Sequence, residues 1–273
     1  MLKKIEKSER FLSKRPHVLR CPICHLEVVL DGSALRCENR HTFNLNKKGY
    51  VNFLQQKPDT VHYTRKMFEP RRRLIESGMY LSVLTEIEKE VVSGNLLDVG
   101  TGEGTFLHLL CHQGDKYGFD LAKDGIEMAT ELGISGFLSL SDLTNLPFLD
   151  GVFSTILNIF TPSNYREFKR VLADDGVILK VVPDRFYLRE LREAYGIPLD
   201  YDNRAVIDRF VQEFPNCERK EIKTIFEIPE ALRDDFLEMS PLEWAVSKEV
   251  KEKAHQAPPC FATIHVVLLI ARK

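Results

Sequence analysis

Residues 94–113 read GNLLDVGTGEGTFLHLLCHQ, and this stretch decides the fold of the middle of the chain. Its apolar beginning predicts a buried strand over residues 96–99. Its apolar end predicts a helix over about residues 103–111. Three alternating glycines lie between them, and glycine lets the backbone turn tightly and approach a ligand closely. The segment therefore predicts a strand, a ligand-binding loop and a helix.

The spacing of this loop argues against two common phosphate-binding loops. A dinucleotide-binding loop has the pattern G-x-G-x-x-G, whereas here the third glycine comes one residue early and Thr105 stands in its place. A P-loop is excluded because no Lys-Ser or Lys-Thr pair follows the glycines. The string that is present is D-x-G-x-G-x-G, beginning at Asp98.

Further strands follow at the spacing expected of a parallel sheet. The strand KYGFD ends on Asp120, 22 residues after Asp98, and GFLSLSD ends on Asp142. A fourth strand is predicted over residues 152–158 and a fifth after the turn at residues 174–176, with helices between the strands. RKEIKTIFEI and FATIHVVLLIAR predict a final antiparallel pair. An acid at the end of the second strand can accept hydrogen bonds from both hydroxyls of a ribose.

The loop, the acids at strand ends and the strand series together resemble the class I S-adenosylmethionine-dependent methyltransferases. The resemblance implies an α/β fold with a seven-stranded, mostly parallel, Rossmann-like sheet, whose glycine loop holds the methionine part of the cofactor. The cofactor contacts that it implies are Asp98, Gly100, Thr101, Gly102, Glu103, Gly104, Thr105, Phe106, Asp120, Leu121, Asp142, Leu143 and Asn158. Plainer alternatives for the four acids are a turn cap for Asp98, a surface acid for Asp120, the cap of the turn DLTNLP for Asp142 and a first-turn helix acid for Glu103.

The front of the chain has the cysteine spacing of a zinc ribbon. The pattern is Cys21-x2-Cys24-x12-Cys37-x3-His41. His25 is a competing ligand, but the spacing from Cys37 favours His41. Four protein ligands make a closed site, which predicts a structural zinc ion and not a catalytic one.

The composition indicates a cytoplasmic protein without a membrane partner. No apolar run approaches the roughly 18 residues that a membrane helix needs, and the N-terminal MLKKIEKSERFLSKR is too polar for a signal peptide. Six cysteines in 273 residues are too few for a disulfide-rich fold. The three outside the ribbon, Cys111, Cys217 and Cys260, are expected to be small hydrophobic residues of the core.

Positive charge is concentrated at the front of the chain. Residues 1–73 carry 17 Lys and Arg against 7 Asp and Glu, whereas the remainder carries 21 against 33. This asymmetry favours a polyanionic partner, and aromatic residues among cations are typical of single-stranded RNA contacts. The residues predicted to contact RNA are Lys47, Lys48, Tyr50, Arg71 and Arg72. Two alternatives stand: Phe43, Tyr50 and Phe53 could pack the ribbon onto the next domain, and the arginines could lie on a solvated helix face.

The order of these features resembles the bacterial 23S ribosomal RNA (guanine-N1)-methyltransferases. Further matching strings are GYVN at residues 49–52, NIFTP at 158–162 and MSPLEW at 239–244. The resemblance implies transfer of a methyl group from S-adenosylmethionine to a guanine N1 in a hairpin loop of 23S ribosomal RNA. Two features depart from the family: Tyr187 stands where it has a histidine, and some sixteen residues precede the ribbon.

The same resemblance implies a target-base pocket and a division of the chain. Asn158, Phe160 and Pro162 are expected at the pocket, just past the fourth strand. The expected segments are an N-terminal extension (1–16), a zinc ribbon (17–56), basic linker helices (57–90) and a methyltransferase domain (91–273). Two other functions stay open, a methyltransferase acting on a small molecule and a zinc RNA-binding protein without activity. A homodimer is one option for the assembly.

Overall fold

The computed structural model describes residues 2–55, 63–199 and 201–273, so the predicted boundary between residues 56 and 57 lies outside the described residues. The chain forms two compact units. The first comprises Met1–Thr64, Val91–Leu179 and Arg272–Lys273, and the second comprises Arg65–Glu90 and Lys180–Ala271. Each unit has its own helices and strands and is described by itself.

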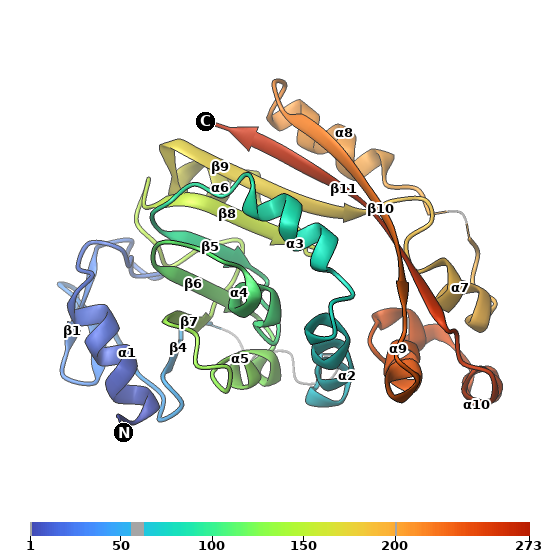
Figure 1. The fold of residues 1–273 in the computed structure, drawn as a ribbon. Helices are drawn as coiled ribbons and strands as arrows, with labels where there is room; N and C mark the ends of the chain where they lie inside the picture. Colours follow the sequence, from blue (N-terminus) through green and yellow to red (C-terminus); the bar gives the residue numbers. More distant parts are fainter. Residues whose placement is uncertain (1, 56–62, 200) are drawn as a thin grey trace. The chain divides into compact units, whose positions relative to one another are not determined.

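A parallel sheet forms the centre of the first unit (Figure 1). Its strand order is β9-β8-β5-β6-β7-β4. The bounds are β4 (Tyr50–Asn52), β5 (Leu96–Val99), β6 (Lys116–Asp120), β7 (Gly136–Leu140), β8 (Phe153–Ile159) and β9 (Leu172–Pro183), whose last residues belong to the second unit. From β5 the chain proceeds through β6 to β7 on one side, and β8 then joins β5 on its other side. The order therefore reverses at β5, where ligands gather in sheets of this kind.

Burial on both faces explains why these segments form central strands. All four residues of β5 are buried, which suits a strand that has helices on both faces. The connecting helices are α4 (Thr105–Leu109), α5 (Lys123–Ala129) and α6 (Tyr165–Val171). Beneath them Tyr117 packs edge-on against Phe148 and Phe153, with ring centroids 6.1 and 5.4 Å away.

The N-terminal part of the first unit contains a helix and a three-stranded antiparallel sheet. These elements are α1 (Lys4–Ser13), β1 (Val28–Asp31), β2 (Ala34–Cys37) and β3 (Thr42–Asn44). The short strand β4 follows and pairs in parallel with β7, so this region completes one edge of the central sheet. The sequence predicted neither α1 nor this strand, because α1 lacks an apolar stripe of the usual width and β4 has only three residues.

The second unit consists of helices and a long antiparallel strand pair. The predicted final pair is confirmed as β10 (Glu218–Glu227) and β11 (Phe261–Arg272), from Glu218 opposite Ile270 to Glu227 opposite Phe261. The helices are α2 (Arg65–Glu76), α3 (Leu81–Glu88), α7 (Arg189–Tyr195), α8 (Arg204–Glu213), α9 (Arg233–Glu238) and α10 (Lys248–Gln256), with 3-10 turns at Glu230–Leu232 and Pro241–Ala245. Among the described helices, none combines the length and the apolarity needed to cross a membrane.

The expectation for the three isolated cysteines is wrong. Cys111 and Cys260 are exposed and Cys217 is half-buried. All three lie in the connections between helices and strands, which run over the surface. The buried positions nearby are taken by longer aliphatic side chains such as Leu110.

Candidate functional site

The glycine loop that follows β5 is packed too tightly for side chains. Gly100 and Gly104 have φ angles of +67° and +79°, which disfavour residues with a Cβ atom. A Cβ atom on Gly100 would lie 2.4 Å from Oγ1 of Thr161, and one on Gly104 would lie 2.7 Å from Cβ of Ala129. Both the positive φ angles and the close packing therefore favour glycine at these two positions.

Two acids fix this loop to the neighbouring strands. Asp98, only 3% exposed, accepts a hydrogen bond from Oγ1 of Thr101 at 2.6 Å. Asp120 at the end of β6 accepts one from the Gly102 amide at 2.8 Å and one from the Ala122 amide at 2.7 Å. Each carboxylate oxygen has more than one lone pair, so these bonds leave the acids able to accept from hydroxyl or ammonium groups.

The chemistry of the loop fits S-adenosylmethionine. Glu103 is 1% exposed and lies between two glycines of the loop, so the loop holds two buried carboxylates, those of Asp98 and Glu103. The cofactor carries an ammonium group and a sulfonium, and buried acids are stabilised by such cations. The hydroxyl of Thr105 is buried and has no hydrogen-bond partner among the described residues, so it offers a further polar contact. The individual roles of these residues stay predictions.

Three other residues predicted to contact the cofactor are more exposed to solvent. Asp142 is exposed, and it accepts a hydrogen bond from the Thr144 amide at 2.8 Å, so it caps the turn that follows β7. This geometry matches the capping alternative, and it leaves the second carboxylate oxygen outside the turn. Leu121 is 48% exposed and Leu143 is half-buried, so apolar side chains flank this edge of the loop.

The loop after β8 is shaped by the side chain of Asn158. This buried amide donates to the Pro162 carbonyl at 3.0 Å and accepts from the Ser163 hydroxyl at 2.7 Å. Phe160 has a φ angle of +54°, a strained conformation for a residue with a side chain, and its ring centroid lies 6.4 Å from that of Phe106. Of the three predicted pocket residues, Asn158 holds the loop, whereas the half-buried Phe160 and the exposed Pro162 lie at its surface.

The structure brings the four predicted zinc ligands together. Their ligand atoms all lie within 4.8 Å of one another. Nδ1 of His41 is 3.5 Å from Sγ of Cys21 and 3.4 Å from Sγ of Cys37, and Sγ of Cys24 is 3.6 Å from that of Cys37. Tetrahedral zinc with bonds of about 2.0–2.3 Å places its ligand atoms roughly 3.5–3.8 Å apart, so the cluster fits this ion.

The turns of the ribbon explain which histidine joins the cluster. His25 is exposed and takes no part in the cluster, whereas His41, the preferred ligand, lies within it. The amide of His25 instead closes the first knuckle by donating to the Cys21 carbonyl at 2.9 Å. A hydrogen bond from the Leu26 amide lowers the pKa of Cys24 to about 6, which favours the thiolate that zinc requires.

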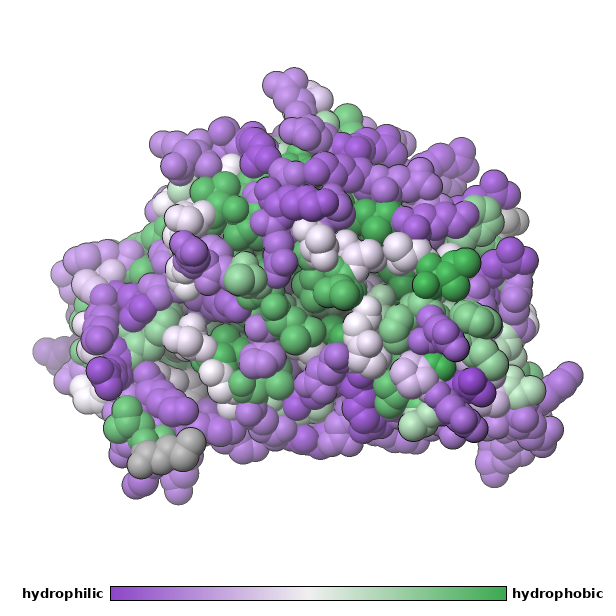
Figure 2. All heavy atoms as spheres, in the orientation of Figure 1, coloured by the Kyte–Doolittle hydropathy of each residue, from purple (hydrophilic) through white to green (hydrophobic). Residues whose placement is uncertain are grey.

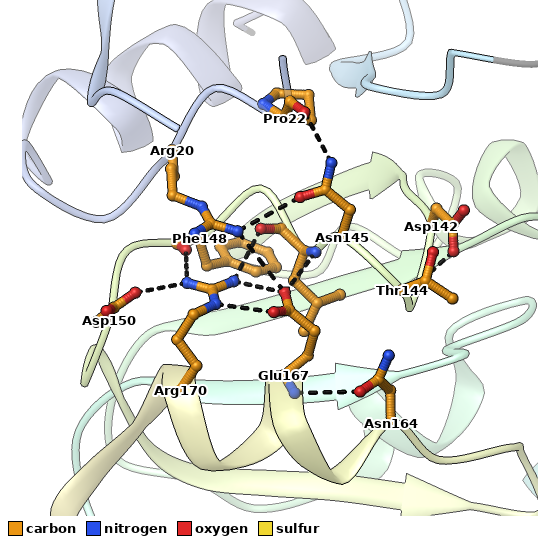
Figure 3. A network of polar contacts seen from close by, with 11 residues as sticks. Arg20, Pro22, Asp142, Thr144, Asn145, Phe148, Asp150, Asn164, Glu167 and Arg170 are labelled. Carbon is orange, nitrogen blue, oxygen red and sulfur yellow. Dashed lines mark hydrogen bonds and ion pairs between the residues drawn. The ribbon is translucent and has the colours of Figure 1, made fainter. Parts of the chain in front are cut away.

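A polar network connects the zinc knuckle to the segment that follows β7 (Figure 3). Nδ2 of Asn145 donates to the Pro22 carbonyl at 2.7 Å, and the Arg20 amide donates to the Pro147 carbonyl at 3.0 Å. Pro22 lies between the first two zinc ligands, and Asn145 lies in the turn that begins at Asp142. The ribbon therefore braces one wall of the predicted cofactor site.

Glu167 is the buried acid at the centre of this network. It forms an ion pair with Arg170 at 2.6 Å, lies 3.8 Å from Arg20, and accepts from the Leu146 amide at 2.8 Å (Figure 3). Burial raises the pKa of Glu167, but the Arg170 guanidinium and the Leu146 amide outweigh burial, and the pKa falls below its ordinary value. Sequence reasoning missed these residues, and only the position of Arg20 beside the first zinc ligand could have pointed to them.

We expect Glu167→Gln to destabilise the fold by about 3 kcal/mol at pH 7, because it takes the charged partner from the largely buried Arg20 and leaves Arg170 with only the exposed Asp150. Since the folded-state pKa is depressed, the stability from this carboxylate is present above the pKa of the unfolded chain, about 4.3, and is lost as the pH falls through the folded pKa. Urea unfolding at pH 7 and pH 4 should therefore show the difference between variant and wild type shrinking at the lower pH. A constant difference would contradict the assignment.

The residues predicted to contact RNA lie in different environments. Lys47 is exposed, while Lys48 forms an ion pair with Glu127 at 2.6 Å. Tyr50 is 3% exposed, and its burial together with Glu127 raises its pKa to about 12. Its ring is part of the core and cannot stack on a base in this arrangement. This matches the alternative in which the aromatic residues pack inside the protein. Arg71 and Arg72 are half-buried in α2 of the second unit.

Two family models match the regions of the chain that contain these sites. A family model described as "RlmA, N-terminal" matches residues 19–58, and one described as "Methyltransferase domain" matches residues 97–179. The solved structure of YcgJ protein from Bacillus subtilis is 17% identical, with a TM-score of 0.48 over 70% of this chain and 97% of that chain.

Two curated relatives extend over most of the chain. The protein named "23S rRNA (guanine(748)-N(1))-methyltransferase" from Streptomyces fradiae is 27% identical over 83% of this chain and 85% of its own length. The protein named "Putative 23S rRNA (guanine-N(1)-)-methyltransferase YxjB" from Bacillus subtilis (strain 168) is 33% identical over 94% of this chain and 97% of its own length. With its zinc ribbon and its glycine loop in the same order, this chain belongs to the 23S rRNA (guanine-N1)-methyltransferase family.

Proposed function

We propose that the protein transfers a methyl group from S-adenosylmethionine to N1 of a guanine in a hairpin loop of 23S ribosomal RNA, in the cytoplasm. The observation that carries the proposal is the glycine loop at the reversal of strand order, with its buried carboxylates of Asp98 and Glu103. A zinc ribbon in the same unit and the names of the relatives support RNA as the substrate. The division of the chain into four segments and the homodimer stay predictions.

The proposed mechanism is mainly one of alignment. S-adenosylmethionine supplies a methyl group that is already electrophilic, so the protein has to place the guanine nitrogen in line with it. Asp98 and Glu103 would hold the amino group of the cofactor, and Asp120 would hold the ribose hydroxyls. The loop that Asn158 shapes would receive the target base, with the ring of Phe160 as the surface on which it stacks.

The proton on guanine N1 has to leave before or during methyl transfer. Residues 158–163 read NIFTPS and contain no carboxylate, and the Pro162 carbonyl already accepts from Asn158. We therefore expect a backbone carbonyl of this loop to accept a hydrogen bond from N1–H, and the proton itself to pass to a water molecule as the new N–C bond forms. A hairpin loop suits the site, since extruding a base costs least where it is unpaired.

Primer extension on 23S ribosomal RNA tests the proposed function. Methylation of N1 blocks Watson–Crick pairing, so we expect a stop in RNA from wild-type cells that disappears when the gene is deleted. The stop should return when the gene is restored and should stay absent with an Asp98→Asn variant, which keeps the size of the side chain but removes its charge. Identical patterns in wild-type and deleted strains would reject this substrate and favour a small molecule.

A further inference from the structure

The helix α1 is fixed firmly against the rest of the first unit. The ring of Phe11 packs edge-on against Tyr117 with centroids 5.5 Å apart, and Oγ of Ser8 donates to the Gly49 carbonyl at 2.6 Å. Gly49 has a φ angle of +87°, and a Cβ atom there would lie 2.8 Å from the carbonyl oxygen of Lys4. The helix is therefore an integral part of the first unit, and its backbone holds the exposed side chains in fixed positions.

Four exposed cations form a stripe along the outer side of α1 and its flanks. Lys3, Lys7, Arg10 and Lys14 follow one another at intervals of four, three and four residues, which places them on one face of a helix. They extend over roughly 16 Å at the rise of an α-helix. Among the contacts that the structure describes, no carboxylate side chain pairs with any of the four. We call these residues the α1 stripe.

The α1 stripe lines one side of a groove of about 860 Å³. The other side is the connection from the end of α5 to β7, residues 129–136, which includes two glycines and small side chains. Lys4, Arg15 and Lys48 also line the groove, and Glu131 is the one carboxylate among its lining residues. The acids of α1 itself, Glu6 and Glu9, are not part of the lining. Figure 2 shows mostly hydrophilic surface where α1 lies, at the left of the view.

The distribution of charge identifies the kind of ligand. A small anion needs only a few converging donors, whereas these cations are spread along the whole length of the groove. A nucleic-acid strand offers a continuous row of phosphates, about one for each 3.4 Å of axial rise, and can therefore meet cations anywhere along the groove. The only aromatic side chain in the lining is Phe11, which is buried, so the groove has no platform for stacking bases. Its contacts would be with phosphates and independent of sequence.

We propose that the groove beside the α1 stripe binds the phosphate backbone of the ribosomal RNA substrate. This contact is separate from the contacts that the protein makes to the target base. The proposal rests on the proposed function for the identity of the RNA. Arg15 and Lys48 are the exceptions within the lining, because Arg15 already forms a bidentate ion pair with Asp115 and Lys48 already pairs with Glu127. The binding charge therefore comes from the α1 stripe, and the helix ahead of the ribbon serves to hold RNA.

The test is the triple variant Lys7→Gln, Arg10→Gln, Lys14→Gln. Filter binding with an unmodified 23S ribosomal RNA transcript, repeated over a range of salt concentrations, measures the affinity and its salt dependence. Three lost phosphate contacts should weaken binding on the order of 50-fold at 0.15 M salt and reduce the slope of log K against log salt by about 2 units. Binding of S-adenosylmethionine, measured by calorimetry, should be unchanged, which shows that the variant is folded.

A matched control removes three exposed cations elsewhere: Arg166→Gln, Arg219→Gln, Lys253→Gln. It should bind RNA within a few-fold of wild type. Wild-type affinity and salt slope in the stripe variant, or an equal loss in the control, would overturn the proposal. Methyl incorporation by the wild-type protein is measured in parallel. If RNA binding depends on the stripe but no guanine N1 is methylated, the proposed function fails and the RNA-binding groove stands.

Discussion

Replacing Gly104 with alanine is expected to weaken binding of S-adenosylmethionine at least about 100-fold, because positive-φ strain and steric overlap act together there. The new Cβ atom would lie 2.7 Å from Cβ of Ala129 and 3.2 Å from Cδ1 of Ile134. The Cδ1 methyl of Ile134 can turn aside, but Cβ of Ala129 is fixed to the backbone of α5, so the loop itself has to move. A displaced loop no longer presents Glu103 and the backbone amides to the cofactor.

Gly133→Ala is the matched control for this variant. Gly133 has a similar φ angle, +67°, but a Cβ atom there meets nothing within 4 Å. It should therefore show only the cost of positive φ, about 1 kcal/mol of stability, with cofactor affinity close to wild type. Calorimetric titration with S-adenosylmethionine and thermal unfolding of both variants decide the matter. Cofactor affinities within about 3-fold of each other would show that close packing at Gly104 does not shape the site.

The second large effect is expected from His41→Asn, which should remove the zinc ion and unfold the ribbon. The change takes away one of four ligands from a cluster held by three short strands, and zinc supplies about 10–16 kcal/mol of apparent binding energy in small zinc modules. We expect the metal content measured by mass spectrometry to fall from one zinc per chain to nearly none. Thermal unfolding should begin at a lower temperature and respond little to a chelator.

His25→Asn is the matched control for the zinc ligand. His25 is exposed outside the cluster and has a φ angle of +62°, a conformation that asparagine tolerates well. This variant should keep its zinc and its chelator-sensitive unfolding. The cofactor affinity of His41→Asn should also fall, because the knuckle that holds Asn145 is lost. Zinc retained by His41→Asn and lost by His25→Asn would reverse the ligand assignment.

The predicted site residues that the structure brings together are those whose spacing along the chain is short or regular. The zinc cluster depends on ligands in two knuckles, and the cofactor loop depends on three alternating glycines. Asp120 was located because the end of a parallel strand is visible as the end of an apolar run, and its bond to the Gly102 amide places it beside the loop. Spacing along the chain is sufficient information for features of this kind.

The features that were missed depend on contacts between distant residues. Asn145 bonds to Pro22, which lies 123 positions away in the sequence. The residues next to either one in the sequence carry no signal that predicts this contact. Tyr50 has cations and amides around it in sequence, which suggested an exposed ring, but strand β4 turns it into the core. Local composition gives the type of a side chain, and only the tertiary fold decides whether it faces solvent.

Strand β4 has a consequence for any attempt to divide the protein. It is three residues long, yet it covers the outer side of β7 along Leu138, Ser139 and Leu140. A truncated protein lacking the first 55 residues would leave the amides and carbonyls of β7 exposed as an open sheet margin. An exposed sheet edge can pair with the edge of another chain. The catalytic portion alone would therefore be prone to aggregate, and strand β4 prevents this in the full protein by covering the edge.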